Sequence, residues 1–166
     1  MWTRDEMLET CQTFLDTSRR MAVTQELVGI AFVFAEHHPQ TDEPIHEVGM
    51  FPMLGDKDDF ARQVQFAVDV TGAAGVLIIV EAWMVLADKE EDLADMYPAS
   101  GSLADHPDRI EAVTATLSLR DGSSVMWMGE ITGSVEAPPR VIAEYEKQET
   151  ETIKGRFASF FAPVED

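Results

Sequence analysis

One acidic residue, Glu81, interrupts the most apolar segment of the sequence, and its position suits acid–base chemistry. The segment from Gly75 to Ala87 carries no other charge. In an extended strand Glu81 shares a face with Ile79 and Trp83. A carboxyl group held against an indole in a dry site gives up its proton less readily, which suits a general acid or base.

A structural role also explains the same glutamate, and we favour it over the catalytic one. A buried carboxylate needs a cationic partner, and Arg109, which begins the next expected strand, is the nearest candidate. Glu111 follows two residues later on the same expected strand. Glu81, Arg109 and Glu111 are therefore candidate catalytic residues, and the alternative is that they tie the following loop to the sheet.

Three of the four histidines, His37, His38 and His46, lie close together in a segment rich in acids. Imidazole and carboxylate groups together are typical of zinc and iron(II) sites. The spacing is poor for such a site, because adjacent histidines on an extended chain point to opposite sides and no pair has helical i, i+4 spacing. The three histidines stay weak candidate metal ligands, and the alternative is a polar hairpin loop.

Other chemistry finds little support in the sequence. There is no Gly-x-Ser-x-Gly motif, and Cys11 falls on the apolar side of an expected helix, where a thiol usually packs as a small core residue. The glycines Gly72 and Gly75 lie between a helix and a strand, the reverse of the order in a phosphate-binding loop. No cofactor is predicted.

Two short segments resemble a known group of proteins. They are Glu81-Ala82-Trp83-Met84 and Pro107-Asp108-Arg109-Ile110-Glu111-Ala112. The pair is similar to an uncharacterised family of bacterial, phage and prophage proteins, in which a Glu-(Ala/Ser)-Trp-Met strand leads through a variable loop to a Pro-x-Arg-x-Glu-Ala strand. The order of elements agrees over roughly residues 25–130, and residue identity over those two segments alone. The resemblance implies no known activity, and a phage-like origin favours an interaction role over metabolism.

The net charge of −19, from 31 acids and 12 bases, restricts the partners. Direct nucleic-acid binding is not expected, because it needs clustered lysine and arginine. Salt adaptation or solubility explains such a surface, and an acidic mimic that binds a basic protein is the alternative. No apolar run approaches the length of a membrane span, and a single cysteine suits the cytoplasm.

Periodicity predicts helices over residues 4–21, 56–71 and 150–162. A Thr3–Glu6 capping box would begin the first helix, and Asp56 and Gly72 would cap the second. The first helix would bury Cys11.

Strands are expected over 27–35, 45–51, 75–87, 109–120 and 123–131, with a type I′ turn at Asp121-Gly122. An acidic loop over 88–108 is long enough to be functional. The order α-β-β-α-β-β-β-α predicts a single α+β domain over residues 1–166, with a mainly antiparallel or mixed sheet of about five strands and its helices on one face.

Two functions remain open at this point. The first is a non-enzymatic interaction or accessory domain that binds a protein partner or further copies of itself. The second is a small hydrolase or metal-dependent enzyme that uses Glu81 or the histidines.

Overall fold

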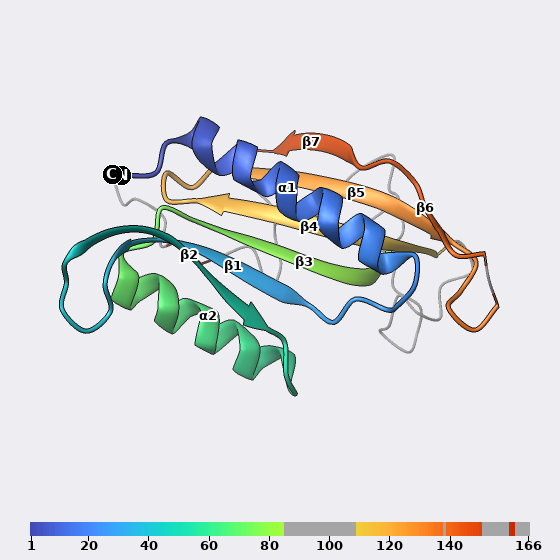
Figure 1. The fold of residues 1–166 in the computed structure, drawn as a ribbon, viewed down its shortest axis with the longest axis horizontal. Helices are drawn as coiled ribbons and strands as arrows, with labels where there is room; N and C mark the ends of the chain where they lie inside the picture. The colour runs from blue at the N-terminus through green and yellow to red at the C-terminus, as the bar shows by residue number, and fades with distance from the viewer. Residues whose placement is uncertain (85–108, 138, 151–159, 162–166) are drawn as a thin grey trace, which may run out of the picture.

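The computed structural model describes residues 1–84, 109–137, 139–150 and 160–161, and these form two helices and seven strands (Figure 1). The helices are α1 (Arg4–Ala22) and α2 (Lys57–Thr71). The strands are β1 (Ile30–His37), β2 (Pro44–Pro52), β3 (Gly75–Met84), β4 (Ile110–Leu119), β5 (Ser124–Thr132), β6 (Val141–Ile142) and β7 (Glu146–Thr150).

The helix ends form as local sequence predicts. The Thr3 hydroxyl accepts a hydrogen bond from the Glu6 amide at 3.2 Å, and the Glu6 carboxylate accepts one from the Thr3 amide at 2.7 Å. Asp56 caps α2 through the amides of its first turn, and Gly72 ends α2 with a φ of 54°, a left-handed value that favours glycine. The predicted capping box and both predicted caps are confirmed.

All strand pairs in the described residues are antiparallel, in the order β2-β1-β3-β4-β5-β6, with β7 also paired to β5. The α+β class is therefore confirmed. The sheet has more strands than expected, because the segment after β5 forms β6 and β7. This places β1, β3 and β4 in the interior of the sheet and leaves β2 at one edge.

The two helices cover opposite faces of the sheet, so the expectation of helices on one face is wrong. Alternate residues of β1 show this: Phe32 and Phe34 join the core that includes Cys11 and Leu15 of α1. Ala31 and Val33 join a second core beneath α2. The α2 residues in this core are Phe60, Val64, Ala67 and Val68. The interior strands are apolar on both faces because each face packs against a different helix.

The hairpin between β4 and β5 is confirmed, but its predicted turn type is wrong. A type I′ turn needs positive φ at both central residues, and here only Gly122 has one, at 89°. The Gly122 amide donates to the Leu119 carbonyl and the Leu119 amide donates to the Ser123 carbonyl, both at 2.9 Å. Asp121 instead uses its carboxylate to accept from the Ser123 amide at 2.8 Å, which stabilises a longer loop.

A helix was expected over 150–162. The residues that the structure describes at its two ends are not helical. Thr150 ends β7, and Phe160 and Phe161 lie outside any helix. Phe160 is nevertheless buried in the core beneath α2, where the side-chain amide of Gln65 donates to the Phe160 carbonyl at 3.0 Å. The long acidic loop predicted over 88–108 lies outside the described residues.

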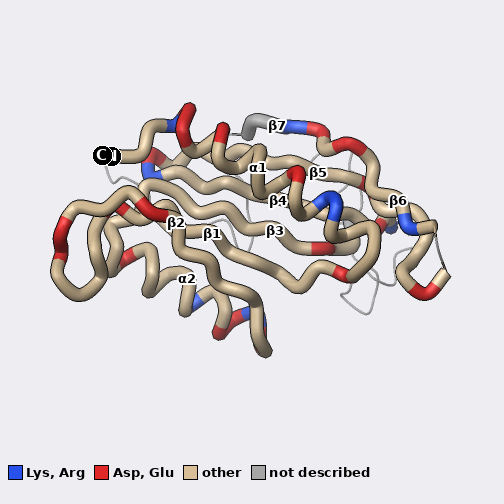
Figure 2. Tube along the Cα trace, viewed as in Figure 1, with Lys and Arg blue, Asp and Glu red and all other residues tan. Residues whose placement is uncertain are grey.

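Acidic residues occur on almost every described element and do not gather in one segment (Figure 2). Arginines are fewer, and Arg19 and Arg20 share the last turn of α1. In the part of the chain that the structure describes, no helix is long and apolar enough to cross a membrane.

Candidate functional site

Glu81 lies inside a buried ion pair with Arg140. The Arg140 guanidinium donates to one Glu81 carboxylate oxygen at 2.7 Å, and the Leu27 amide donates to the other at 2.8 Å. The side chains are 2% and 11% exposed for Arg140 and Glu81. Both carboxylate oxygens therefore have protein donors, so the predicted partner of Glu81, Arg109, was wrong.

Arg140 joins several segments that are distant in the sequence. Its guanidinium also donates to the carbonyls of Ala22 at 2.5 Å and Gln25 at 2.8 Å, where α1 ends and the following loop begins. The Glu111 carboxylate lies 4.0 Å away on β4. The arginine therefore holds the end of α1, the next loop and two strands together.

The remaining residues singled out by the sequence lie beside this pair. Trp83 is paired with Glu111 in the β3–β4 register, and the Arg109 guanidinium lies 5.0 Å from the centre of the Trp83 ring. At that distance a cation is attracted to the face of the ring. The structure thus brings Glu81, Arg109 and Glu111 to the same end of β3 and β4.

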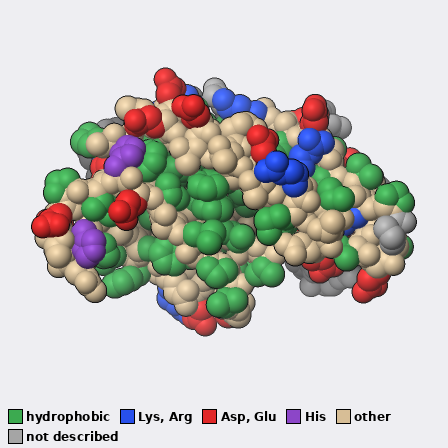
Figure 3. All heavy atoms as spheres, in the orientation of Figure 1, with side chains coloured by type: hydrophobic (Ala, Val, Ile, Leu, Met, Phe, Trp, Pro, Cys, Tyr) green, Lys and Arg blue, Asp and Glu red, His purple; other side chains and the backbone are tan. Residues whose placement is uncertain are grey.

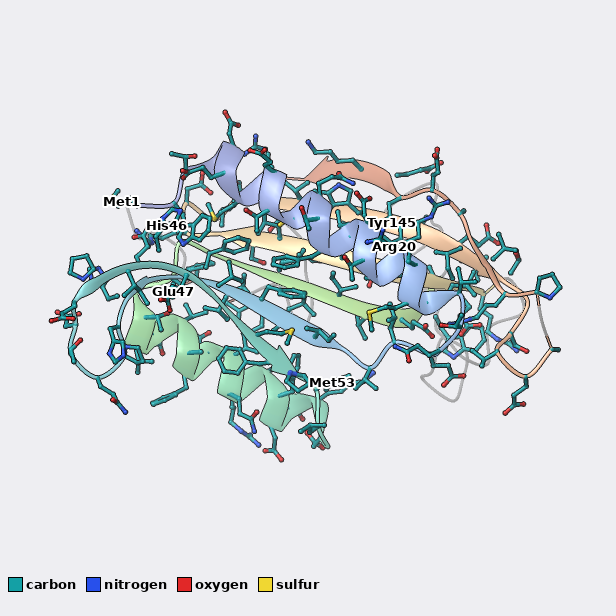
Figure 4. The ribbon with its side chains drawn as sticks, in the orientation of Figure 1. Met1, Arg20, His46, Glu47, Met53 and Tyr145 are labelled. Carbon is teal, nitrogen blue, oxygen red and sulfur yellow. The ribbon has the colours of Figure 1, made fainter. Side chains whose placement is uncertain are left out.

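The three histidines have separate surroundings. His46 stacks on Trp2 with ring centroids 3.7 Å apart, and on β2 it points away from the side to which Glu47 points (Figure 4). His38 accepts hydrogen bonds from the Gln40 and Thr41 amides through Nδ1, at 3.2 and 3.3 Å. His37 lies against Gly72 at the end of α2.

No group of three or more His, Cys, Asp or Glu side chains in the described ranges is placed to hold a metal ion. The candidate ligands His37, His38 and His46 are not gathered by the fold into one such group. Their roles in the described residues are local: a ring stack, a turn and a helix end.

A second ion pair, between the buried Glu36 and the exposed Arg120, joins β1 to the end of β4. Arg120 donates to Glu36 at 2.8 Å, to the Gly72 carbonyl at 2.5 Å and to the Ala73 carbonyl at 3.2 Å. Burial disfavours the Glu36 carboxylate, but the hydrogen bonds from Arg120 and from the Trp2 amide outweigh burial and lower its pKa. A shallow cavity of about 360 Å³ adjoins this pair and His37.

An apolar depression lies between α1 and the β1–β2 hairpin, and we call it the α1 groove. Its volume is about 450 Å³. It is lined by Thr13, Phe14, Thr17, Ser18, Met21, Leu27, Val28, Ile30, Phe32, Met50 and Ile79. Figure 3 shows hydrophobic side chains gathered on the central part of the same face of the molecule.

The α1 groove exists because α1 does not cover the whole sheet. The helix packs on β3 and β4. Phe14 of α1 stacks on Phe32 of β1 with ring centroids 4.0 Å apart, so this part of β1 is covered and the exposed apolar side chains lie at the edge of the groove. Val28 and Met50 at its edge are 58% and 65% exposed.

A further apolar depression, the α2 groove, lies on the opposite side between α2 and β2. It has a volume of about 550 Å³ and is lined by Pro39, Phe51, Arg62, Gln63, Phe66, Ala67, Val70 and Thr71. Phe66 at its edge is 69% exposed. The α2 groove is a second apolar depression with which the α1 groove can be compared. An ion pair between Arg62 and Asp59 lies nearby on α2.

Sequence reasoning missed the α1 groove and Arg140. The apolar residues of the groove fall within the expected helix and strands, and periodicity shows which face of an element is apolar but not which part of that face stays exposed. Arg140 lies in a short irregular segment between β5 and β6 that has no periodic pattern.

Comparisons with known proteins add no relationship. No protein-family model, no curated protein and no solved structure matches this chain.

Proposed function

We propose that this chain is a non-catalytic binding domain whose α1 groove takes up an apolar ligand. The observation that carries the proposal is the groove itself, an apolar depression of about 450 Å³. Binding sites for small ligands typically have volumes of about 300–1,000 Å³ and are lined mainly by apolar side chains with few polar groups. The α1 groove has this composition, with Thr13, Thr17 and Ser18 as its polar members.

The exposure of its edge residues supports the same proposal. Met21, Val28 and Met50 are 39%, 58% and 65% exposed, and they lie together around one depression. Scattered apolar residues are ordinary on a protein surface, whereas a contiguous apolar area is typical of a binding surface. The flexible methionine side chains suit ligands of varied shape.

The surroundings of Glu81 favour a binding role over the alternative of catalysis at this residue. A general acid or base needs access to the proton it transfers. Glu81 is 11% exposed, and its oxygens accept from Arg140 and from the Leu27 amide. These contacts support the hypothesis that Glu81 stabilises the fold.

The test compares two variants that add a charge at equally exposed positions. Met50→Asp places a carboxylate in the α1 groove, and Phe66→Asp places one in the α2 groove, at residues 65% and 69% exposed. Binding of the uncharged fluorescent dye Nile red is measured by its emission shift. We expect Met50→Asp to reduce dye affinity at least about tenfold, because the dye would have to desolvate the carboxylate, and Phe66→Asp to leave it unchanged.

Val28→Asp serves as a second groove variant, with circular dichroism and urea unfolding as checks that each variant is folded. Absence of dye binding to the wild-type protein would refute the proposal. Equal loss of affinity in Met50→Asp and Phe66→Asp would also refute it, because the dye would then not distinguish the α1 groove.

A further inference from the structure

The two edges of the described sheet differ in how they are protected against pairing with another chain. One edge is formed by the two-residue β6 and the five-residue β7, which carries the exposed charges of Glu146 and Lys147. Short strands and charged side chains are common means of preventing such pairing. The other edge is β2, which has nine residues, no lysine or arginine, and Glu47 as its one acidic residue. The β2 edge is therefore much less protected.

Backbone groups of β2 point away from the sheet. Among the described strands, β2 pairs with β1 alone. The Met53 amide donates to the Gly29 carbonyl at 2.6 Å, one residue beyond the end of the β1–β2 register. Because hydrogen-bonded and non-hydrogen-bonded pairs alternate in an antiparallel ladder, the amides and carbonyls of Val48 and Met50 point outward. Those of His46, which Figure 4 labels toward the other end of this edge, follow the same alternation.

Two prolines limit the outward donors of this edge. Pro44 and Pro52 end β2, and Val48 lies midway between them. Proline has no amide hydrogen, so it cannot donate to a neighbouring strand. The β1–β2 register shifts near His46, which has no β1 partner in it. The outward amides of the strand are therefore those of His46, Val48 and Met50.

We propose that two copies of this chain associate through β2, with the two strands antiparallel about a two-fold axis at Val48. Val48 then pairs with its own copy, and His46 pairs with Met50 of the partner subunit. Every outward amide has an outward carbonyl opposite it, and the pairing stops at the prolines. An axis at Gly49 would instead place the His46 carbonyl opposite Pro52, which has no amide to donate. The inference does not depend on what the α1 groove binds.

The side chains and charges of β2 are compatible with this pairing. The Glu47 carboxylate lies opposite Gly49 of the partner subunit, so like charges do not face each other directly across the strands. Ile45 lies opposite Phe51, an apolar pair of the kind that stabilises neighbouring strands. Each copy has a net charge of −19, which opposes association at long range. Salt screens this repulsion, so we expect association to strengthen with ionic strength.

Sedimentation equilibrium of the full chain at about 0.05 and 0.5 M NaCl measures the association. Met50→Lys places a charge on the β2 edge, and Val141→Lys places the same charge on β6 at the opposite edge. The two residues are 65% and 52% exposed. Because both variants have the same net charge, a difference between them reports the position of the lysine. Val48→Pro removes the central outward amide and no hydrogen bond to β1.

We expect the wild-type protein to dimerise with a Kd that falls at least about tenfold from low to high salt. Met50→Lys should raise the Kd at least about tenfold, because a lysine on an edge strand disfavours pairing. Val141→Lys should leave the Kd within about twofold of wild type. Val48→Pro should weaken the dimer as strongly as Met50→Lys, because it removes two of the hydrogen bonds at the axis.

A wild-type protein that stays monomeric at about 100 µM in high salt would overturn the inference. So would equal weakening by Met50→Lys and Val141→Lys. A dimer that persists unchanged in Met50→Lys would also overturn it, because the association would then use another surface. Circular dichroism and urea unfolding check that each variant is folded, and Met50→Lys decides alone if Val48→Pro does not fold.

Discussion

The Arg140 guanidinium lies 2.7 Å from the Glu81 carboxylate, and this contact joins the end of α1 to the interior of the sheet. Arg140 belongs to a segment after β5, whereas Glu81 lies on β3. The same arginine bonds the carbonyls of Ala22 and Gln25. Stability, and not turnover, is therefore the property we expect to change when either residue is substituted.

Glu81→Gln is expected to lower the free energy of unfolding by about 3 kcal/mol, because it leaves the buried guanidinium of Arg140 without its nearest counter-charge. Urea unfolding measures the change. Glu130→Gln, on the exposed side of β5, is the control and is expected to change stability by less than about 0.5 kcal/mol. A Glu81→Gln variant as stable as wild type would contradict the structural role.

The Glu81–Arg140 pair is expected to show coupling in a double-mutant cycle. Glu81→Leu and Arg140→Met are each destabilising, since each leaves one buried charge unpaired. The double variant removes both charges, so its loss of stability should be smaller than the sum of the two by about 1–3 kcal/mol. Urea unfolding of the four proteins gives this value, and strict additivity would show that the two charges do not interact.

Glu36 is expected to make stability depend on pH in the acid range. Its pKa in the folded protein lies below the ordinary value of 4.5, because hydrogen bonds from Arg120 and the Trp2 amide outweigh the effect of burial. The stabilisation is therefore complete above pH 4.5 and is lost as pH falls through the lower folded value.

Urea unfolding of the wild type and of Glu36→Gln tests this dependence. The stability difference between the two proteins should shrink with decreasing pH. Glu47→Gln, an exposed substitution on β2, is the control for the removal of a carboxylate. A difference that stays constant with pH would contradict the prediction.

Cys11 is expected to be unreactive in the folded protein. The side chain is fully buried beneath α1, and burial raises the pKa of its thiol to about 12. Thiol reagents should react only through unfolding, so the labelling rate should rise with urea as the unfolded population does. Labelling as fast as that of a free thiol would show that the Cys11 side chain is not buried between α1 and the sheet.

The same shift gives a signed prediction at high pH. Above the ordinary thiol value of 9.0 the unfolded chain loses the Cys11 proton while the folded chain keeps it. The folded state then binds more protons, so stability falls as pH rises from 9.0 toward 12. Cys11→Ala should lack this contribution, which a comparison of the two proteins by urea unfolding isolates.

The sequence places Glu81, Trp83 and Glu111 on two successive expected strands, and the fold pairs these strands with each other. Trp83 and Glu111 become cross-strand partners once β3 and β4 are recognised as adjacent strands. The ion-pair partner of Glu81, Arg140, could not be predicted in this way. Its segment has no regular pattern, and its position depends on contacts with α1 that form only in the folded chain.

The existence of α1 and α2 was predictable, but the face of the sheet that each helix covers was not. Capping residues and apolar spacing identify α1 and α2 from short stretches of sequence. Which face of the sheet each helix covers depends on the connections and on the burial of both sides of β1, where Phe34 faces α1 and Val33 faces α2. The α1 groove follows from the lateral position of α1 over β3 and β4, which periodicity does not report.

The single sheet also separates the interior into two compartments with independent packing. Val33 and Phe34 are neighbours in the chain, yet they belong to different cores. A change of side-chain volume in a close-packed core is felt by its immediate neighbours. A substitution in the core on one side of the sheet leaves the volume of the core on the other side unchanged. The residues beneath α1 and those beneath α2 can therefore change independently during evolution.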